Sequence, residues 1–368
     1  MKKILFSIGS LQLGGAETVL VDILNKISNK FDIDLLLIDK TGPLLEKLNS
    51  NINVKSLVDS NDNSLFTKIY KSLIYRGLYK SSIYCKYIYN NVLKKKYDVE
   101  VGFLAGVPCE IIKRSPNLNS KKYMWIHCEV KKDDIDTYNQ YKRIYKSFDK
   151  LIGVSEKSIN TFINTFPDCK DKIELIYNYV DIDKILNKSK EEIKDNYLKN
   201  KINFISVGRV VTEKAYDRII DLANCFKDDI QFNIIGKGNE KENLENKITN
   251  DKITNVRLLG QKSNPYPYIL NSDVFLLSSR SEAYPTVIIE AMILNKFIIS
   301  TDVPGVKEIL KNYDTKIIVE NSTKGIEKGI KEYLKYKDKY KKNVSNNSAF
   351  IKQNSSNLKK VVDLLNEK

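Results

Sequence analysis

The stretch that decides the fold is residues 3–38, KILFSIGSLQLGGAETVLVDILNKISNKFDIDLLLI. Lys3–Ile8 and Asp34–Ile38 are apolar runs of strand length, and Glu17–Ile27 between them has the apolar spacing of an amphipathic helix. Two strands joined by a helix form a βαβ unit, which requires a parallel sheet covered by helices. This stretch therefore predicts an α/β fold.

The same alternation continues through most of the chain. Further strands are predicted at Val99–Phe103, Tyr123–Ile126 and Lys150–Val154 and, after a polar, lysine-rich stretch at residues 183–201, at Ile202–Val207, Gln231–Ile235, Val256–Leu259, Val274–Leu277, Phe297–Ser300 and Lys316–Val319. We predict two successive doubly wound, Rossmann-like domains with a boundary near residue 180. Two such domains face each other across a cleft, and ligands bind beyond the carboxyl ends of the strands.

Composition limits the class of protein. A chain of 368 residues, 42% of them hydrophobic, is long enough for two domains with cores of their own. No apolar run reaches the length of a membrane span, and the run that follows Lys2 and Lys3 is too short for a signal peptide, so we expect a cytoplasmic protein. The net charge of +15 predicts an anionic partner, although the codon usage of an AT-rich genome is an alternative explanation of the excess lysine.

Metal ligands are sparse. The five cysteines form no CxxC pair, which favours reduced thiols, and His127 is the single histidine, so a metal site would need carboxylates. Asp-x-Asp pairs at 32/34, 134/136 and 181/183 could chelate a divalent cation beneath a diphosphate. The first begins a strand, the third lies in the interdomain link, and such short matches arise by chance. We therefore predict no metal site.

Residues 65–97 differ from their surroundings. They contain eight basic residues and no acidic ones, interleaved with tyrosine, isoleucine and leucine at helical spacing. This pattern is typical of a basic amphipathic surface on an anionic membrane. It is equally typical of a helix pair that packs its apolar face on the sheet, and the two interpretations stay open. Stacking of single-stranded nucleic acid on the tyrosines is a weaker third interpretation.

Three loops that follow predicted strands contain candidate binding residues. Gly14 and Gly15 directly precede the first helix, where backbone N–H groups attract an anion, but Gly9 is too far upstream for a GxGxxG fingerprint. His127 follows the Tyr123–Ile126 strand, in the half of the domain expected to face the cleft. After Ile202–Val207, Gly208 leads to Arg209 and Lys214, two cations placed to grip a diphosphate.

Glycine also follows later strands of the second half. Gly236 lies in IIGKG, and the glycine of LLGQKS directly precedes Gln261. The stretch 279–292, SRSEAYPTVIIEAM, contains two carboxylates, Glu282 and Glu290. We expect a helix to begin near Pro285, which leaves the N–H groups of Thr286, Val287 and Ile288 for an anion. Carboxylates accept hydrogen bonds from vicinal hydroxyls, so the pattern predicts a nucleotide sugar: phosphates flanked by hydroxylated rings.

Taken together, these loops resemble the retaining GT-B glycosyltransferases of family four, the group 1 glycosyl transferases of the E-x7-E type. The ordered matches run through most of the chain: GGAE at 14–17, WIHCE at 125–129, VSE at 154–156, IYNYVD at 176–181, VGR…EK at 207–214, IIGKG at 234–238, Glu282 and Glu290 as E-x7-E, and DVPGVKEIL at 302–310. The resemblance implies an N-terminal acceptor-side domain at 1–178, a C-terminal nucleotide-sugar-binding domain at 179–349, and a last helix at about 350–368 packing back on the first domain.

The resemblance also implies roles. Arg209 and Lys214 would hold the donor diphosphate, Glu290 the nucleotide ribose and Glu282 the transferred sugar. The amides of Gly15 and of the residues after Tyr284 and Pro285 would meet the phosphates and sugar, and His127 would lie beside the reacting carbon. The common EGFP appears here as EAYP, so Ala283 adds a methyl group where the donor sugar would lie, and ILNKF at 293–297 replaces the usual small-residue-Gly-x-Pro. Both departures bear on donor identity.

The implied activity is metal-independent, retaining transfer of a hexose or N-acetylhexosamine from a nucleotide diphosphate sugar, with UDP as the expected nucleotide and no cofactor. The acceptor would be a glycan or lipid-linked glycan in surface polysaccharide or glycoconjugate synthesis, and the enzyme would be peripheral on the inner membrane face if residues 65–97 meet lipid. No nucleic acid is expected. The alternatives are a GT-B sugar-nucleotide epimerase and a non-catalytic binder of nucleic acid or another anionic polymer.

Overall fold

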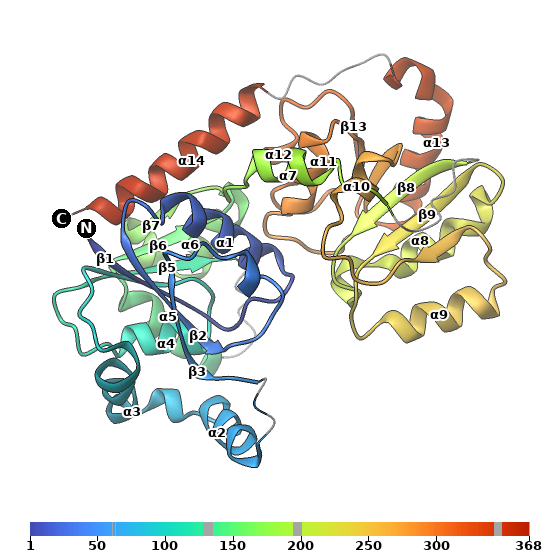
Figure 1. Cartoon of the computed structure of the whole chain (residues 1–368). Helices are drawn as coiled ribbons and strands as arrows, with labels where there is room; N and C mark the ends of the chain where they lie inside the picture. The colour runs from blue at the N-terminus through green and yellow to red at the C-terminus, as the bar shows by residue number, and fades with distance from the viewer. Residues whose placement is uncertain (61, 63, 128–134, 194–200, 342–347, 368) are drawn as a thin grey trace. The chain divides into compact units, whose positions relative to one another are not determined.

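The computed structural model describes residues 1–60, 62, 64–127, 135–193, 201–341 and 348–367. Backbone contacts divide the chain into two compact units, Met1–Tyr179 with Asn354–Lys368, and Val180–Gln353. Each unit is a parallel β-sheet with helices packed on it, as Figure 1 shows. Both sheets are therefore of the doubly wound kind that the alternation of strands and helices predicted.

The first domain has a seven-stranded parallel sheet in the order β3-β2-β1-β4-β5-β6-β7. The strands are β1 (Lys3–Ile8), β2 (Asp32–Asp39), β3 (Asn53–Val58), β4 (Val99–Gly102), β5 (Lys121–Ile126), β6 (Lys150–Gly153) and β7 (Ile173–Leu175). The central strands β1, β4 and β5 are almost wholly buried, since helices cover both faces of a parallel sheet.

The helices of this domain are α1 (Gly15–Ile27), α2 (Leu65–Tyr75), α3 (Ser82–Tyr87), α4 (Val107–Lys113), α5 (Ile135–Lys146) and α6 (Glu156–Thr165). The last helix of the chain, α14 (Ser348–Asn366), ends against the same domain. There Lys2 Nζ donates to the Leu365 carbonyl at 3.1 Å, and Lys150 Nζ lies 2.6 Å from Glu367 Oε1. The C-terminal helix thus closes the first domain rather than extending the second.

The second domain has a six-stranded parallel sheet in the order β10-β9-β8-β11-β12-β13. Its strands are β8 (Ile202–Val207), β9 (Ile230–Ile235), β10 (Val256–Leu258), β11 (Val274–Leu277), β12 (Phe297–Thr301) and β13 (Lys316–Val319). Its helices are α7 (Ile182–Lys188), α8 (Tyr216–Ala223), α9 (Lys241–Asn250), α10 (Tyr266–Leu270), α11 (Thr286–Ile293), α12 (Val306–Ile309) and α13 (Thr323–Lys341).

Residues 65–97 combine features of both open interpretations. The side chains of Ile74, Cys85, Ile88, Tyr89 and Leu93 join the hydrophobic core of the first domain. Large apolar side chains on the other face of α2, among them Phe66 and Ile69, are exposed. The segment is therefore a set of helices packed on the domain, and it also presents an apolar surface to solvent. None of the described helices is long and apolar enough to cross a membrane.

Candidate active site

The order of strands in the second domain places its topological switch point between β8 and β11. From β8 the chain moves outward through β9 to β10, and then returns to the opposite side of β8 with β11. The loops after β8 and β11 therefore diverge at the carboxyl edge, which is where ligands bind in open α/β sheets. Lys214 lies in the first loop and Glu282 in the second, as the sequence predicted for binding residues.

The two side chains are in direct contact. Lys214 Nζ lies 2.5 Å from Glu282 Oε1, and the Ser279 hydroxyl donates to the same oxygen at 2.7 Å. The adjacent carboxylate of Glu213 is not part of this pair. Both side chains of the pair are largely buried, so the cation and the carboxylate are held at a fixed place at the strand switch point.

Arg209 lies close by in sequence, and its side chain is exposed. Within the described ranges no acceptor or acidic group pairs with its guanidinium. A Cβ on Gly208 would stand 3.2 Å from Lys214 Cε and 3.0 Å from the Tyr216 hydroxyl, so a larger residue would have to displace these side chains by a few tenths of an ångström. Gly236, after β9, lies so close to the Gly208 carbonyl that a Cβ would collide with it. The glycines thus shape this edge by close backbone packing.

The helix α11 begins where the sequence placed it, with Pro285 as its N-cap residue. The backbone N–H groups of Thr286 and Val287 make no hydrogen bond to any residue within the described ranges. The prediction for Ile288 was wrong, because its N–H donates to the Pro285 carbonyl at 3.1 Å. Two amides rather than three therefore point out of the helix start, where an anion is favoured.

The remaining predicted donor-binding residues lie on α11, in the loop before it and after β10. Glu290 lies one turn into α11 and is only 8% exposed. Gly305, in the loop after β12, has φ +78°, and a Cβ there would lie 2.8 Å from the Ala283 carbonyl and 3.1 Å from Tyr284 Cα. The backbone at Gly305 thus packs closely against the loop that contains Ala283 and Tyr284. Gln261 is exposed after the end of β10.

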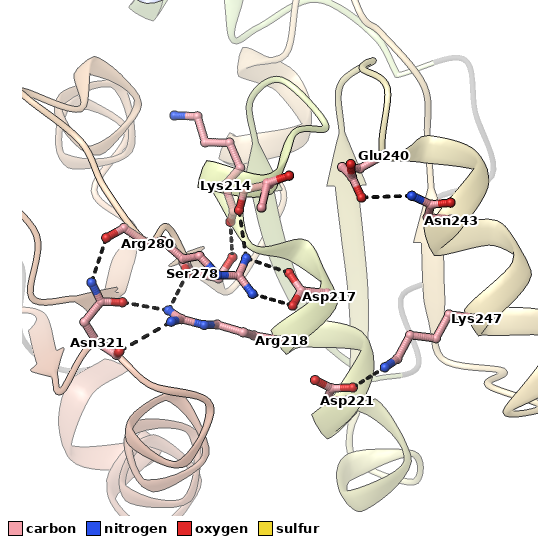
Figure 2. A network of polar contacts seen from close by, with 11 residues as sticks. Lys214, Asp217, Arg218, Asp221, Glu240, Asn243, Lys247, Ser278, Arg280 and Asn321 are labelled. Atoms are coloured by element: carbon pink, nitrogen blue, oxygen red, sulfur yellow. Dashed lines mark hydrogen bonds and ion pairs between the residues drawn. The ribbon is translucent and has the colours of Figure 1, made fainter. Parts of the chain in front are cut away.

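A network of polar contacts joins the two loops, and no pattern in the sequence indicates it (Figure 2). Arg280 donates to both carboxylate oxygens of Asp217, at 2.9 and 2.6 Å, and to the Thr212 carbonyl at 2.7 Å. The Ser278 hydroxyl donates to the Lys214 carbonyl at 2.8 Å. Burial alone would raise the pKa of Asp217, but the hydrogen bonds from Arg280 lower it. These bonds fix the turn from which Lys214 projects.

The turn needs this support because its last residue is strained. Ala215 adopts φ +54°, in the left-handed region that is unfavourable for residues other than glycine. Arg218 anchors the other side, donating to the Ser278 carbonyl at 3.2 Å and to Asn321 Oδ1 at 2.7 Å. Asn321 in turn donates to the Arg280 carbonyl at 2.8 Å. Loops that follow β8, β11 and β13 are joined in this way (Figure 2).

The first domain contributes a second group of predicted residues. Gly14 is the N-cap of α1 and Gly15 its first residue, after β1. A Cβ on Gly14 would collide with the carboxylate of Glu17. His127 follows β5, and its ring centroid lies 4.7 Å from that of Phe103, which follows the neighbouring strand β4. The predicted site residues thus form two groups, each at the carboxyl edge of its own sheet.

Comparisons with known proteins agree with this geometry. Residues 188–349, nearly the whole second domain, match the family model described as glycosyl transferases group 1. The second domain is therefore similar to the group 1 glycosyltransferases. An N-acetylgalactosaminyltransferase of Campylobacter jejuni that acts on N-acetylgalactosamine-N,N'-diacetylbacillosaminyl-diphospho-undecaprenol is 26% identical over 94% of this chain and 93% of that protein. The capsular polysaccharide biosynthesis glycosyltransferase CapH of Staphylococcus aureus is 25% identical over 84% of each.

An uncharacterized glycosyltransferase of Methanocaldococcus jannaschii is 30% identical, but the alignment spans only 52% of this chain and 51% of that protein. Among solved structures, Anabaena HepE in complex with UDP and glucose superimposes with a TM-score of 0.77 at 16% identity, covering 99% of both chains. TarM superimposes with a TM-score of 0.73 at 14% identity, covering 100% of this chain and 99% of the other. The fold of this chain is therefore GT-B, as predicted.

His127 gives a prediction about pH. Burial lowers its pKa to about 3, and its Nε2 is enclosed with no hydrogen-bond partner among the described residues. The folded chain holds the imidazole neutral, whereas the unfolded chain takes up a proton below about pH 6.5. Stability is therefore lost as the pH falls from about 6.5 towards 3, by about 1.4 kcal/mol at pH 5.5.

Because the chain has one histidine, the single imidazole resonance in an NMR titration reports this directly. We expect no titration between pH 8 and pH 5, and we expect His127→Gln to remove this part of the pH dependence of unfolding. A resonance that titrates near pH 6.5 would contradict the prediction.

The Asp-x-Asp pairs lie away from the two groups of site residues or outside the described ranges. Asp32 and Asp34 are at the amino-terminal end of β2, where Lys95 Nζ lies 2.9 Å from an oxygen of each. Asp181 caps α7 by accepting from the Lys184 N–H. Asp134 lies outside the described residues. The described part of the chain holds no group of three or more His, Cys, Asp or Glu side chains placed to bind a metal ion.

Proposed function

We propose that this chain is a retaining glycosyltransferase that transfers a hexose or N-acetylhexosamine from a UDP-sugar to a glycan or lipid-linked glycan. The observation that supports it most is the contact between Lys214 and Glu282 at the strand switch point, beside Arg209 and the start of α11. One contact thereby brings together a cation suited to a diphosphate and a carboxylate suited to sugar hydroxyls.

The proposed chemistry assigns charges to these groups. Breaking the anomeric bond builds positive charge on the sugar ring and negative charge on the departing diphosphate. Lys214, Arg209 and the amides of Thr286 and Val287 stabilise the negative charge, in place of a metal ion. Glu282 accepts from the hydroxyls of the transferred sugar, and Glu290 accepts from the ribose. The neutral imidazole of His127 contacts the sugar through hydrogen bonds rather than as an acid.

The acceptor class rests on the relatives. One acts on a diphospho-undecaprenol-linked glycan and another takes part in capsular polysaccharide biosynthesis, and each aligns over most of this chain. We infer that this chain also elongates a surface polysaccharide or glycoconjugate at the cytoplasmic face of the membrane. Ala283 and Tyr284, which stand in the loop that would meet the donor sugar, are the residues we expect to set donor choice.

Hydrolysis of UDP-sugars by the purified chain tests the proposal. UDP-glucose, UDP-galactose and their N-acetyl forms are incubated with the enzyme without acceptor, with and without EDTA, and UDP release and the sugar product are measured. We expect slow release of UDP from one of the four donors, unchanged by EDTA, with the α-anomer of the sugar formed first. Full loss of activity in EDTA would contradict the proposal and indicate a metal-dependent mechanism.

The same experiment separates the alternatives. Conversion of one UDP-sugar into its epimer, without acceptor, would indicate an epimerase. No turnover, together with co-purified nucleic acid and a binding constant that falls steeply with salt, would indicate a binder of anionic polymer.

A further inference from the structure

An unusual concentration of exposed apolar side chains lies on α2 and α3. Seven of the thirteen exposed large hydrophobic residues of the described chain fall between residues 65 and 87: Leu65, Phe66, Ile69, Leu73, Tyr75, Ile83 and Tyr87. Phe66 is 76% exposed and Ile83 84%. Single exposed apolar residues are ordinary, but a cluster of this kind marks an interaction surface.

The α2 residues form one stripe. Leu65, Phe66, Ile69 and Leu73 have the i, i+1, i+4, i+8 spacing of a single helical face, and Ile74 on the opposite face is fully buried. The Tyr70 hydroxyl lies 2.7 Å from that of Tyr84, so α3 packs directly beside α2. The inner apolar face of these helices already packs on the core of the domain. The outer stripe is therefore left for a partner outside the chain.

The charge around the stripe identifies the chemistry of that partner. Between residues 65 and 97 there are eight Lys or Arg and no Asp or Glu. Lys68 on α2 and Lys86 on α3 are exposed, and so are Arg76 and Lys80 between the two helices. A shallow apolar stripe bordered by cations and tyrosines matches an anionic bilayer, where apolar side chains enter the acyl boundary and cations meet head groups. Nucleic acid would need exposed aromatic rings for stacking, whereas most of this stripe is aliphatic.

The helix α2 is also tied to the edge of the sheet that contains the site. Lys71 Nζ lies 2.5 Å from Asp39 Oδ2, and the Ser60 hydroxyl donates to the same oxygen at 2.7 Å. Asp39 is the last residue of β2, so these contacts fix α2 at the carboxyl edge of the first sheet. The loop with Gly14 and Gly15, after β1, lies at that same edge.

We propose that the exposed faces of α2 and α3 dock this chain on an anionic lipid bilayer, with the carboxyl edge of the first domain held next to the head groups. The purpose of this docking surface rests on the proposed function, because a lipid-linked acceptor would meet the enzyme at this edge. The binding itself is independent of catalysis and is measured without any donor.

Co-sedimentation of the full chain with vesicles tests the surface. One set is phosphatidylcholine alone and the other contains phosphatidylglycerol. We expect binding to the anionic vesicles only, weakened by salt, and an at least tenfold loss of affinity in the double variant Phe66→Ser, Ile69→Ser, since burying two large apolar side chains is worth about that much or more. Lys68→Gln with Arg76→Gln should weaken binding and reduce its salt dependence.

The matched control is Leu118→Ser, which removes an 89% exposed leucine of the same domain outside the docking surface. It should bind vesicles like the wild type. Equal binding of Phe66→Ser, Ile69→Ser and wild type, or binding of single-stranded DNA in place of vesicles, would overturn the proposal. UDP-sugar hydrolysis without acceptor should be unchanged in the double variant. If vesicles bind as expected while no UDP-sugar is turned over, the proposed function fails and the docking surface stands.

Discussion

Replacing Lys214 by alanine is expected to lower turnover of the UDP-sugar by about a hundredfold to a thousandfold, the effect of removing one preorganised donor from a developing anion. The amine is held 2.5 Å from Glu282 by the turn that Arg280 and Ser278 fix, so its position costs no reorganisation during the reaction. Steady-state release of UDP measures the effect.

The loss should greatly exceed the effect on stability, because Lys214 projects from a loop and the Ser279 hydroxyl still donates to the Glu282 carboxylate when the lysine is removed. Lys247→Ala is the control: it also removes a lysine paired with a carboxylate at 2.5 Å in this domain, Asp221, but on the helices α8 and α9 rather than at the carboxyl edge. Wild-type turnover in Lys214→Ala, or an equal loss in Lys247→Ala, would count against the diphosphate role.

The parts of this fold that were predicted from the sequence are those with a local signal. β8, β11 and β13 match the predicted strands residue for residue, because buried parallel strands are continuous apolar runs between polar loops. β3 (NVKSLV) and β7 were missed. β3 is a half-exposed edge strand with polar residues in its run, and β7 has only three residues, so neither leaves an apolar run long enough to recognise.

The site was predictable only in part, for a similar reason. Glycines and charged residues after strands are visible in the sequence, and so is the start of α11. The bond from the Ile288 N–H to Pro285 depends on how tightly the first turn closes, and no residue pattern encodes it. Arg280 binds Asp217, 63 residues away, through the strand order β8-β11. Such contacts follow from the topology of the sheet, so spacing along the chain does not reveal them.

Glu290 is the second residue for which a large effect is expected. If its carboxylate accepts from the ribose hydroxyls of the donor, Glu290→Ala should weaken UDP binding roughly tenfold to a hundredfold, the range for a hydrogen bond to a charged group. Isothermal titration calorimetry with UDP measures this. Glu290→Gln keeps the volume of this buried side chain, so a loss shared by both variants reflects the charge and not a cavity in α11.

Pyrophosphate distinguishes the ribose role from a general effect on the site. It contains the diphosphate but no ribose, so its affinity should be the same in Glu290→Gln and the wild type, whereas Lys214→Ala should weaken both ligands. Glu327→Gln, which removes a partly buried carboxylate paired with Lys331 on α13, is the control and should bind UDP normally. Unchanged UDP affinity in both Glu290 variants would remove the ribose role. Equal losses for UDP and pyrophosphate would instead assign Glu290 to the structure of the helix start, where the amides of Thr286 and Val287 would meet the phosphates.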